Sequence, residues 1–191
     1  GAAPQPPLPP PPAPEATASR AAVAAGFDFL PPLATEVALR ELAVEAPASG
    51  IRLLSLSGNA IGGAGRALAR LLRSPALEEL ELAGCSLTRD DIMRLAPALP
   101  KSRLSRLELA RNSLASAELS LLAANLPTSN IQELGLENNE IGRGSALEAF
   151  ADACKKRPIP HLRLSGNRMS EKELASFMTS VRGRRPPRGS L

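Results

Sequence analysis

The chain has 191 residues and a mass of 20.0 kDa, which suits one domain of ordinary size and is short for two. Aromatic residues make up only 2% of it, with no Trp or Tyr, which argues against nucleic-acid binding by base stacking and against an interface built on aromatic anchors. Two Cys are too few for a disulfide framework, and a single His excludes most catalytic triads and His-based metal sites. The sequence has no apolar window of about 18 residues, so it predicts no membrane span.

The formal net charge of +4 is concentrated at one end of the chain. The last ten residues hold four Arg and no acid, whereas residues 21–181 carry 18 basic and 18 acidic groups. The body of the protein is therefore neutral, and the sequence pI near 9.7 describes the tail. A neutral body without aromatic platforms makes nucleic acid an unlikely partner.

Residues 1–20 form a proline-rich segment, with Pro at eight of the first 14 positions. Proline fixes φ and removes the backbone donor, so we expect a disordered segment that samples polyproline II. The run Leu8, Pro9, Pro10, Pro11 and Pro12 is similar to the ligands of EVH1 domains, SH3 domains and profilin, which predicts a polyproline-recognition partner. A stiff, solvated linker is the alternative interpretation.

Residues 21–50 are interpreted as a degenerate N-terminal cap for the segments that follow. Phe27, Phe29, Leu30 and Leu33 predict an irregular first turn, and Pro31-Pro32 breaks any strand there. Residues 36–44 have the composition of a helix.

Residues 51–182 contain five copies of one template, L-x-x-L-x-L-x-x-N/C-x-L, which start at residues 51, 77, 104, 131 and 159. The first copy places Ile51, Leu54, Leu56, Asn59 and Ile61 at the template positions. A fixed period of 26–28 residues is the signature of stacked repeats that bury their apolar edges against each other. The L-x-L core of each copy predicts a short strand with its leucines facing inward.

Helix-like stretches lie between the template segments, near residues 62–73, 89–99, 116–126, 144–157 and 171–182. Their apolar residues recur at spacings of three and four. Thr88 with Asp91, and Ser170 with Glu173, are typical of capping boxes that open helices. The last stretch is expected to close the stack.

The template resembles leucine-rich repeats, and the repeat length with a full helix is similar to the ribonuclease-inhibitor-like subclass, which also occurs in tropomodulin, NOD-like receptors and GALA-type bacterial effectors. The resemblance covers residues 51–182. It implies an α/β fold, a right-handed leucine-rich-repeat solenoid with a parallel β-sheet on the concave face and helices on the convex face.

Asn59, Asn112, Asn139 and Asn167 fall where the chain leaves each strand, and their amides are expected to bond backbone groups from repeat to repeat. Cys85 takes that position in the second repeat, which favours a buried structural thiol over a reactive one. Cys154 lies on an apolar helix face, and two unpaired thiols suit a reducing compartment.

No enzyme pattern survives, so we predict that the chain is not an enzyme and needs no cofactor or metal. The glycine-rich stretch 58–65 lacks the Lys-Ser or Lys-Thr of a phosphate loop. His161 has no second catalytic group beside it and is interpreted as a surface residue.

The outward strand positions line up in columns because neighbouring strands lie about 4.8 Å apart. Five Glu fall close together, and we expect Arg106 and Arg111 to relieve their repulsion. These positions predict a concave docking surface for a basic segment of a protein partner, with a solvated mixed-charge face as the alternative. The predicted partner-binding residues are Glu79, Glu81, Arg106, Glu108, Arg111, Glu133, Glu137, His161 and Arg163.

Residues 183–191 form a tail with Arg, Pro and Gly that is expected to be disordered. The tail is interpreted as a solvated end, a nuclear-import or phosphate-binding patch, or an internal competitor for the acidic surface.

The sequence therefore predicts a non-catalytic protein–protein interaction module, a scaffold or recognition domain. A cytoskeletal regulator that recruits profilin or EVH1 domains through the proline-rich segment is one alternative. The substrate-recognition part of an effector or immune receptor is another. We expect an intracellular location, cytoplasmic or nuclear, unless the chain is a secreted effector.

Overall fold

Five three-residue strands occupy the same positions in the five template segments. In the computed structural model, which describes residues 36–182, these strands pair in parallel in chain order, from β1 to β5. Their bounds are β1 Leu53–Ser55, β2 Glu79–Glu81, β3 Arg106–Glu108, β4 Glu133–Gly135 and β5 His161–Arg163. The predicted α/β class and the five parallel strands are confirmed.

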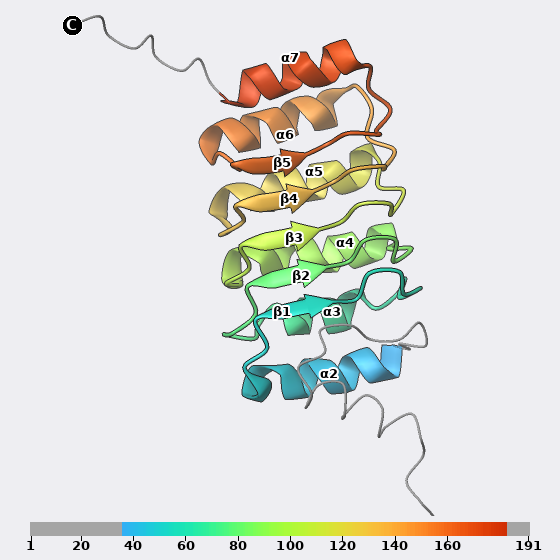
Figure 1. Cartoon of the computed structure of the whole chain (residues 1–191), viewed down its shortest axis with the longest axis vertical. Coiled ribbons are helices and arrows are strands. Elements are labelled where there is room, and N and C mark those ends of the chain that lie inside the picture. The colour runs from blue at the N-terminus through green and yellow to red at the C-terminus, as the bar shows by residue number, and fades with distance from the viewer. Residues whose placement is uncertain (1–35, 183–191) are drawn as a thin grey trace, which may run out of the picture.

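Six α-helices accompany the sheet within residues 36–182, and those between consecutive strands lie behind it (Figure 1). Their bounds are α2 Glu36–Ser49, α3 Gly65–Leu71, α4 Arg89–Leu95, α5 Ser116–Asn125, α6 Ser145–Lys156 and α7 Glu171–Arg182. Helix α2 packs beside α3, and α7 packs beside α6 at the other end of the stack. None of the helices in the described range is long and apolar enough to cross a membrane.

Two helices are shorter than the sequence predicts, and each has a local cause. Helix α3 begins at Gly65 rather than at residue 62, because Gly63 has a φ of 91°, outside the helical region. Helix α4 ends at Leu95 and continues as the 3₁₀ helix η1, Ala96–Lys101, which contains Pro97 and Pro100. Proline cannot donate the backbone bond that an α-helix needs, so the chain tightens there. A second 3₁₀ helix, η2 Leu126–Thr128, follows α5.

The middle residue of every strand points between the sheet and the helices. These five residues are buried, and they belong to one continuous apolar core that extends from α2 to α7: Leu54, Leu80, Leu107, Leu134 and Leu162. Each repeat places a leucine at the same strand position, so each repeat covers the apolar side chains of its neighbour.

The asparagine positions form a hydrogen-bonded ladder across the repeats. Asn112 accepts from the backbone N–H groups of Cys85 and Leu87, at 2.9 and 3.2 Å, and donates to the carbonyls of Leu82 and Leu109. Asn139 makes the equivalent bonds one repeat further on. Asn167, two repeats further on, accepts from the N–H of Ile141 and donates to the carbonyls of Leu136 and Leu164. The side chains therefore satisfy buried backbone groups that the turn leaves unpaired.

Cys85 replaces one rung of this ladder. Its thiol donates to the carbonyl of Leu56 at 3.1 Å, as an asparagine amide would. A thiol has no amide oxygen, and the N–H of Ile61 bonds instead to the Cys85 carbonyl at 3.1 Å. Burial raises the pKa of the Cys85 thiol to about 11 and that of Cys154 to about 12, which fits two structural thiols.

Asp91 joins the first two repeats through the glycine-rich stretch. Its carboxylate accepts from the backbone N–H groups of Gly63 and Gly65 and from both the N–H and the hydroxyl of Thr88. A side chain at Gly65 would meet the Asp91 backbone at 2.6 Å, so the glycine permits a close approach. The Thr88–Asp91 and Ser170–Glu173 capping boxes are both present. The fold thus accounts for the glycines.

Residues 1–35 and 183–191 lie outside the described range. The proline-rich segment, its Leu8 to Pro12 run, most of the proposed cap and the arginine tail therefore stay predictions.

Candidate functional site

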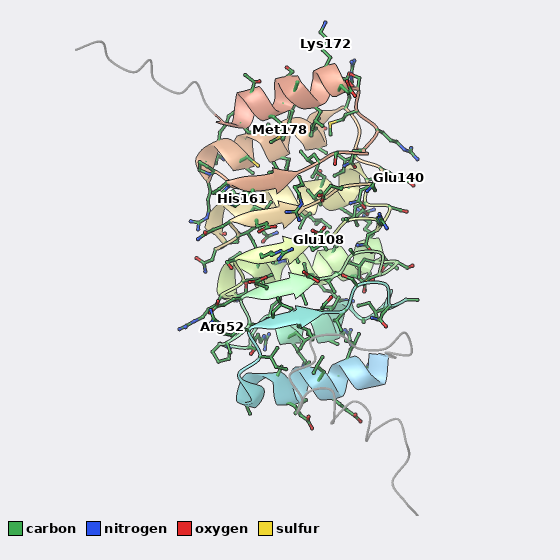
Figure 2. All side chains as sticks on the ribbon, in the orientation of Figure 1. Arg52, Glu108, Glu140, His161, Lys172 and Met178 are labelled. Atoms are coloured by element: carbon green, nitrogen blue, oxygen red, sulfur yellow. The ribbon has the colours of Figure 1, made fainter. Side chains whose placement is uncertain are left out.

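The side of the sheet turned away from the helices carries the charged residues predicted from the columns. We call this surface the sheet face. It consists of the first and third residues of each strand together with Glu137, which follows β4. The register pairs Glu79 with Arg106, Arg106 with Glu133, and Glu133 with His161, and it pairs Glu81 with Glu108 and Gly135 with Arg163. Glu108 lies over the middle strand, on the side turned toward the viewer (Figure 2).

Arg163 of β5 binds three carboxylates from the two preceding repeats. Its Nη1 lies 2.5 Å from Oε1 of Glu133, and its Nε lies 2.6 Å from Oε1 of Glu137. Its Nη2 donates to Oε2 of Glu108, two strands away. The guanidinium uses its planar fork to hold Glu side chains that would otherwise repel each other.

Gly135 makes the longest of these contacts possible. It stands between Glu108 and Arg163 in the same column, and it has no side chain to separate them. A Cβ atom at this position would clash with the Glu108 carboxylate, so the carboxylate occupies the space that the glycine leaves. The absence of a side chain at Gly135 therefore lets Arg163 of β5 contact Glu108 of β3 across strand β4.

Arg106 forms a second, looser cluster on the middle strand. Its Nη1 lies 3.3 Å from Glu79, its Nη2 lies 3.5 Å from Glu81, and its Nε lies 3.4 Å from Glu133. Glu133 contacts both arginines and so joins the two clusters into one network.

The network keeps an excess of negative charge, because five carboxylates share two guanidiniums. The hydrogen bond from Arg163 holds the pKa of Glu133 below its ordinary value, against a smaller opposing effect of burial. The same bond, with those to Glu108 and Glu137, raises the pKa of Arg163. The second carboxylate oxygen of Glu137, Oε2, is buried and accepts no hydrogen bond from the described residues. The network is therefore acidic overall, although this particular oxygen is covered by surrounding atoms.

Arg111 was expected to relieve the repulsion among these glutamates, and that expectation is wrong. Arg111 is exposed, and it forms no ion pair with another residue of the range 36–182. Its φ is 57°, and the equivalent residues of the other repeats, Gly58, Gly84, Asn138 and Gly166, also have φ between 53° and 79°. This left-handed turn carries Arg111 off the strand, and Arg163 takes the predicted role.

The glutamates are also less exposed than simple outward strand positions imply. The side chain of Glu108 is 14% exposed and that of Glu81 is 27% exposed. A charge reversal at these two positions would therefore disturb the network and the stability together. Glu79, at 36%, is the most accessible carboxylate of the set. His161 is exposed at the start of β5.

The structure brings together eight of the nine predicted sheet-face residues, and the role of Arg163 as a hub was not predicted. The signal was present in the sequence, as a glycine in the column between Glu108 and Arg163. An argument from strand spacing considers only residues on adjacent strands. It therefore does not predict the contact between Arg163 and Glu108, which passes over Gly135 on the strand between them.

The site offers charged groups suited to the recognition of a charged partner. Among residues 36–182, no group of three or more His, Cys, Asp or Glu is arranged to hold a metal ion. The described thiols are buried, away from the sheet face.

Comparisons with known proteins identify the fold. No protein-family model matches the chain, and no curated protein matches it. A solved structure described as "Leiomodin-1 Actin-Binding Site 2 (ABS2)" matches with a TM-score of 0.57 and 16% sequence identity, over 75% of this chain and 84% of that one. This likeness supports a leucine-rich-repeat-like α/β fold.

Proposed function

We propose that the protein is a non-catalytic interaction module whose sheet face binds a protein partner that presents Lys or Arg side chains. The observation that carries this proposal is the network of five carboxylates and two guanidiniums, which leaves three negative charges on one contiguous surface. The two arginines fix the carboxylates in position, so a partner would not need to order them on binding.

The proposal includes the shape of the molecule as a right-handed, ribonuclease-inhibitor-like solenoid with the sheet on its concave side. Strands stack about 4.8 Å apart, whereas packed helices need 8–10 Å. A stack with one layer of each bends toward the strands, which supports a concave sheet face. Crossovers between parallel strands are right-handed in nearly all proteins, which supports the hand.

A basic partner is favoured over an acidic one by the distribution of exposed groups. Glu79 is the most accessible carboxylate of the network, and it lies with Glu81 around Arg106, at 3.3 and 3.5 Å. These groups would accept charge-assisted hydrogen bonds and would speed association with a basic segment.

The test is capture of partners from a cell lysate on the immobilised 191-residue chain, followed by quantitative mass spectrometry. Glu79→Gln with Glu81→Gln removes two charges from the sheet face, and Glu41→Gln with Glu45→Gln removes two from exposed positions of α2. We expect the sheet-face variant to lose partners that the α2 variant keeps, and we expect rising salt to weaken their capture. Equal capture by both variants would refute the proposed surface.

A cytoskeletal role is the second candidate, and the structural neighbour favours it because that protein is described as an actin-binding site. The predicted polyproline ligand at residues 8–12 points to the same class of function, through profilin or EVH1 domains. A peptide of residues 4–14 should then bind one of these domains, and the chain should co-sediment with actin filaments. Failure of both measurements would leave the sheet-face proposal standing alone.

The proposed location is the cytoplasm or nucleus. Cys85 and Cys154 are both free and buried, and their raised pKa values make them poor partners for disulfide exchange. A reducing compartment suits such a pair.

A further inference from the structure

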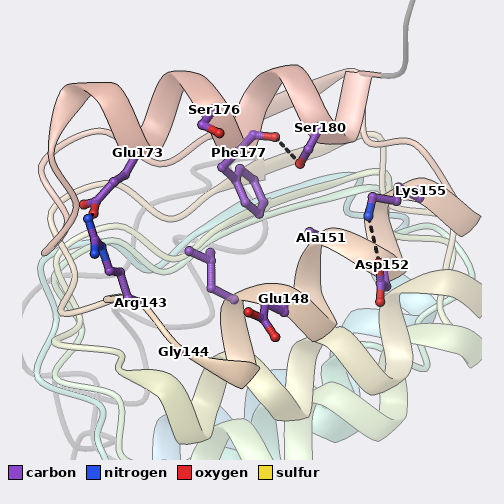
Figure 3. Close-up of a pocket in the computed structure, with 11 residues that line it drawn as sticks. Arg143, Gly144, Glu148, Ala151, Asp152, Lys155, Glu173, Ser176, Phe177 and Ser180 are labelled. Carbon is purple, nitrogen blue, oxygen red and sulfur yellow. Dashed lines mark hydrogen bonds and ion pairs between the residues drawn. The ribbon is translucent and has the colours of Figure 1, made fainter.

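The last two helices leave a groove between them on the opposite layer from the sheet face. It has a volume of about 540 Å³. Leu147 and Ala151 of α6 and Phe177 of α7 contribute its apolar lining (Figure 3). The ring of Phe177 stacks on that of Phe150, with centroids 6.0 Å apart, so the groove rests on the packed core.

Charged residues border this groove and leave it with an excess of negative charge. Arg143 pairs with Glu173 at one end, and Lys155 pairs with Asp152 at the other. Glu148 lies between these pairs, is exposed, and forms no ion pair with another described residue. The groove therefore combines an apolar floor with one carboxylate that lacks a counter-charge.

We propose that residues 183–191 of this chain bind in the α6–α7 groove. Helix α7 forms one wall of the groove and ends at Arg182. Ser180, two residues before that end, lies at the same end of the groove as the Asp152–Lys155 pair (Figure 3). The nine residues that follow contain Arg184, Arg185 and Arg188 and no acid. They therefore begin at one end of the groove and carry the charge that complements its border.

The length and composition of the segment fit the groove. Nine extended residues reach about 30 Å, and a helix of 12 residues such as α7 is about 18 Å long, so the segment can cover the whole groove. The first residue after α7 is Gly183, and a glycine permits the backbone conformations that a reversal of direction would need. Pro186 and Pro187 have few conformations to lose on binding, and their rings suit an apolar floor.

This inference does not rest on the proposed partner binding by the sheet face, since the two surfaces belong to different layers. It makes the arginine segment an occupant of the helix layer, rather than a competitor for the glutamates of the sheet.

The experiment places a nitroxide label at Ser190→Cys in the full chain and records the broadening of backbone amide signals. The two native thiols are buried with pKa values of about 11 and about 12, so the label goes to position 190. We expect the amides of Gly144 and Glu173, which lie at the opposite end of the groove from Ser180 (Figure 3), to lose intensity. A segment that did not bind would not bring its label to that end.

Two variants in the labelled chain test the charge complementarity. Glu148→Lys should restore most of the lost intensity, because it places a like charge beside the arginines. Glu45→Lys makes the same change at an exposed position of α2 and should leave the broadening unchanged. Replacing Arg184, Arg185 and Arg188 by Gln should act like Glu148→Lys. The inference is overturned if the broadening falls on β2 and β3, if it is absent from the fold, or if Glu45→Lys matches Glu148→Lys.

Discussion

Single side chains decide how the charged surface of this protein is organised. Gly135 has no side chain, and Arg163 can therefore bond to Glu108 across the intervening strand. Glu133 matters because it touches both arginines and links two clusters. A count of acids and bases would describe the same surface as a patch of repelling glutamates, whereas the contacts make it a fixed network.

Replacement of Arg163 by Met should destabilise the protein by about 1–2 kcal/mol at pH 7, less than three separate charged hydrogen bonds because the guanidinium is partly exposed. The pKa of Glu133 is lower in the folded state than its ordinary value of 4.5. The stabilisation that Glu133 contributes is therefore fully present above pH 4.5, and it is lost as the pH falls through the lowered pKa. The difference in unfolding free energy between the wild-type protein and Arg163→Met should therefore decrease from pH 7 to pH 3, as measured by urea unfolding followed by circular dichroism. If this difference did not change with pH, the ion pairs of Arg163 would not be its cause.

The left-handed turn after each strand gives a second prediction at this scale. Gly84→Ala should cost about 1–2 kcal/mol although a Cβ there would meet nothing within 4 Å, because the cost is conformational. Arg111→Gly should be neutral or stabilising, since it relieves the same strain. Unfolding free energies of the two variants check this. A stabilising Gly84→Ala would show that the turn is not left-handed.

At the scale of elements, the asparagine ladder ties each strand end to its neighbours. Asn112 satisfies two N–H groups of one repeat and carbonyls of two repeats. At the equivalent position, the Cys85 thiol still donates to a backbone carbonyl, but it has no amide oxygen to accept from backbone N–H groups. The element that results is a turn whose backbone groups are paired by side chains rather than by water.

Asn112→Ala should destabilise the protein by about 3–5 kcal/mol, because several buried backbone groups lose their partners at once. Asn125→Ala, on the partly buried face of α5, removes one bond to the Leu121 carbonyl and is the matched control, with an expected cost below about 1 kcal/mol. Thermal unfolding of both variants compares them. Similar losses would mean that the ladder contributes no more than an ordinary side chain.

The elements that recur could be predicted from the sequence, and the features that occur once could not. Each strand was predicted at its position because the Leu80, Leu107 and Leu134 template repeats in register. The end of α4 depends on Pro97 and Pro100, which belong to one repeat alone. The columns placed the sheet-face residues correctly. The partners of Arg163 could not be predicted, because they depend on side-chain rotamers and on the open space at Gly135, and the repeat template specifies neither.

At the scale of the molecule, stability comes from neighbours that cover each other. The pairing of strands runs in order from β1 to β5, and the core leucines form one cluster from α2 to α7. Stacks of this kind are stabilised by the sum of interfaces between adjacent repeats, so a lesion in the middle affects two interfaces.

Leu107→Ala, in the central strand, should cost about 2–5 kcal/mol because this side chain is 0% exposed and its removal leaves a cavity. Leu121→Ala in α5, where the leucine is only partly buried, should cost less. Circular dichroism suits both measurements, since the chain has no Trp or Tyr. A loss below about 0.5 kcal/mol for Leu107→Ala would show that the register of β3 is wrong.

If the proposed function is right, the partner binds to the sheet face and not to the helix layer. A photo-crosslinking amino acid at Ser55 or Ser165, on the sheet side, can be compared in the full chain with one at Ser120, which is exposed on α5. One partner should be crosslinked from both sheet-side positions and not from Ser120, and the crosslink should weaken as salt rises. Crosslinking of a partner from Ser120 and from neither sheet-side position would show that the helix layer binds it instead.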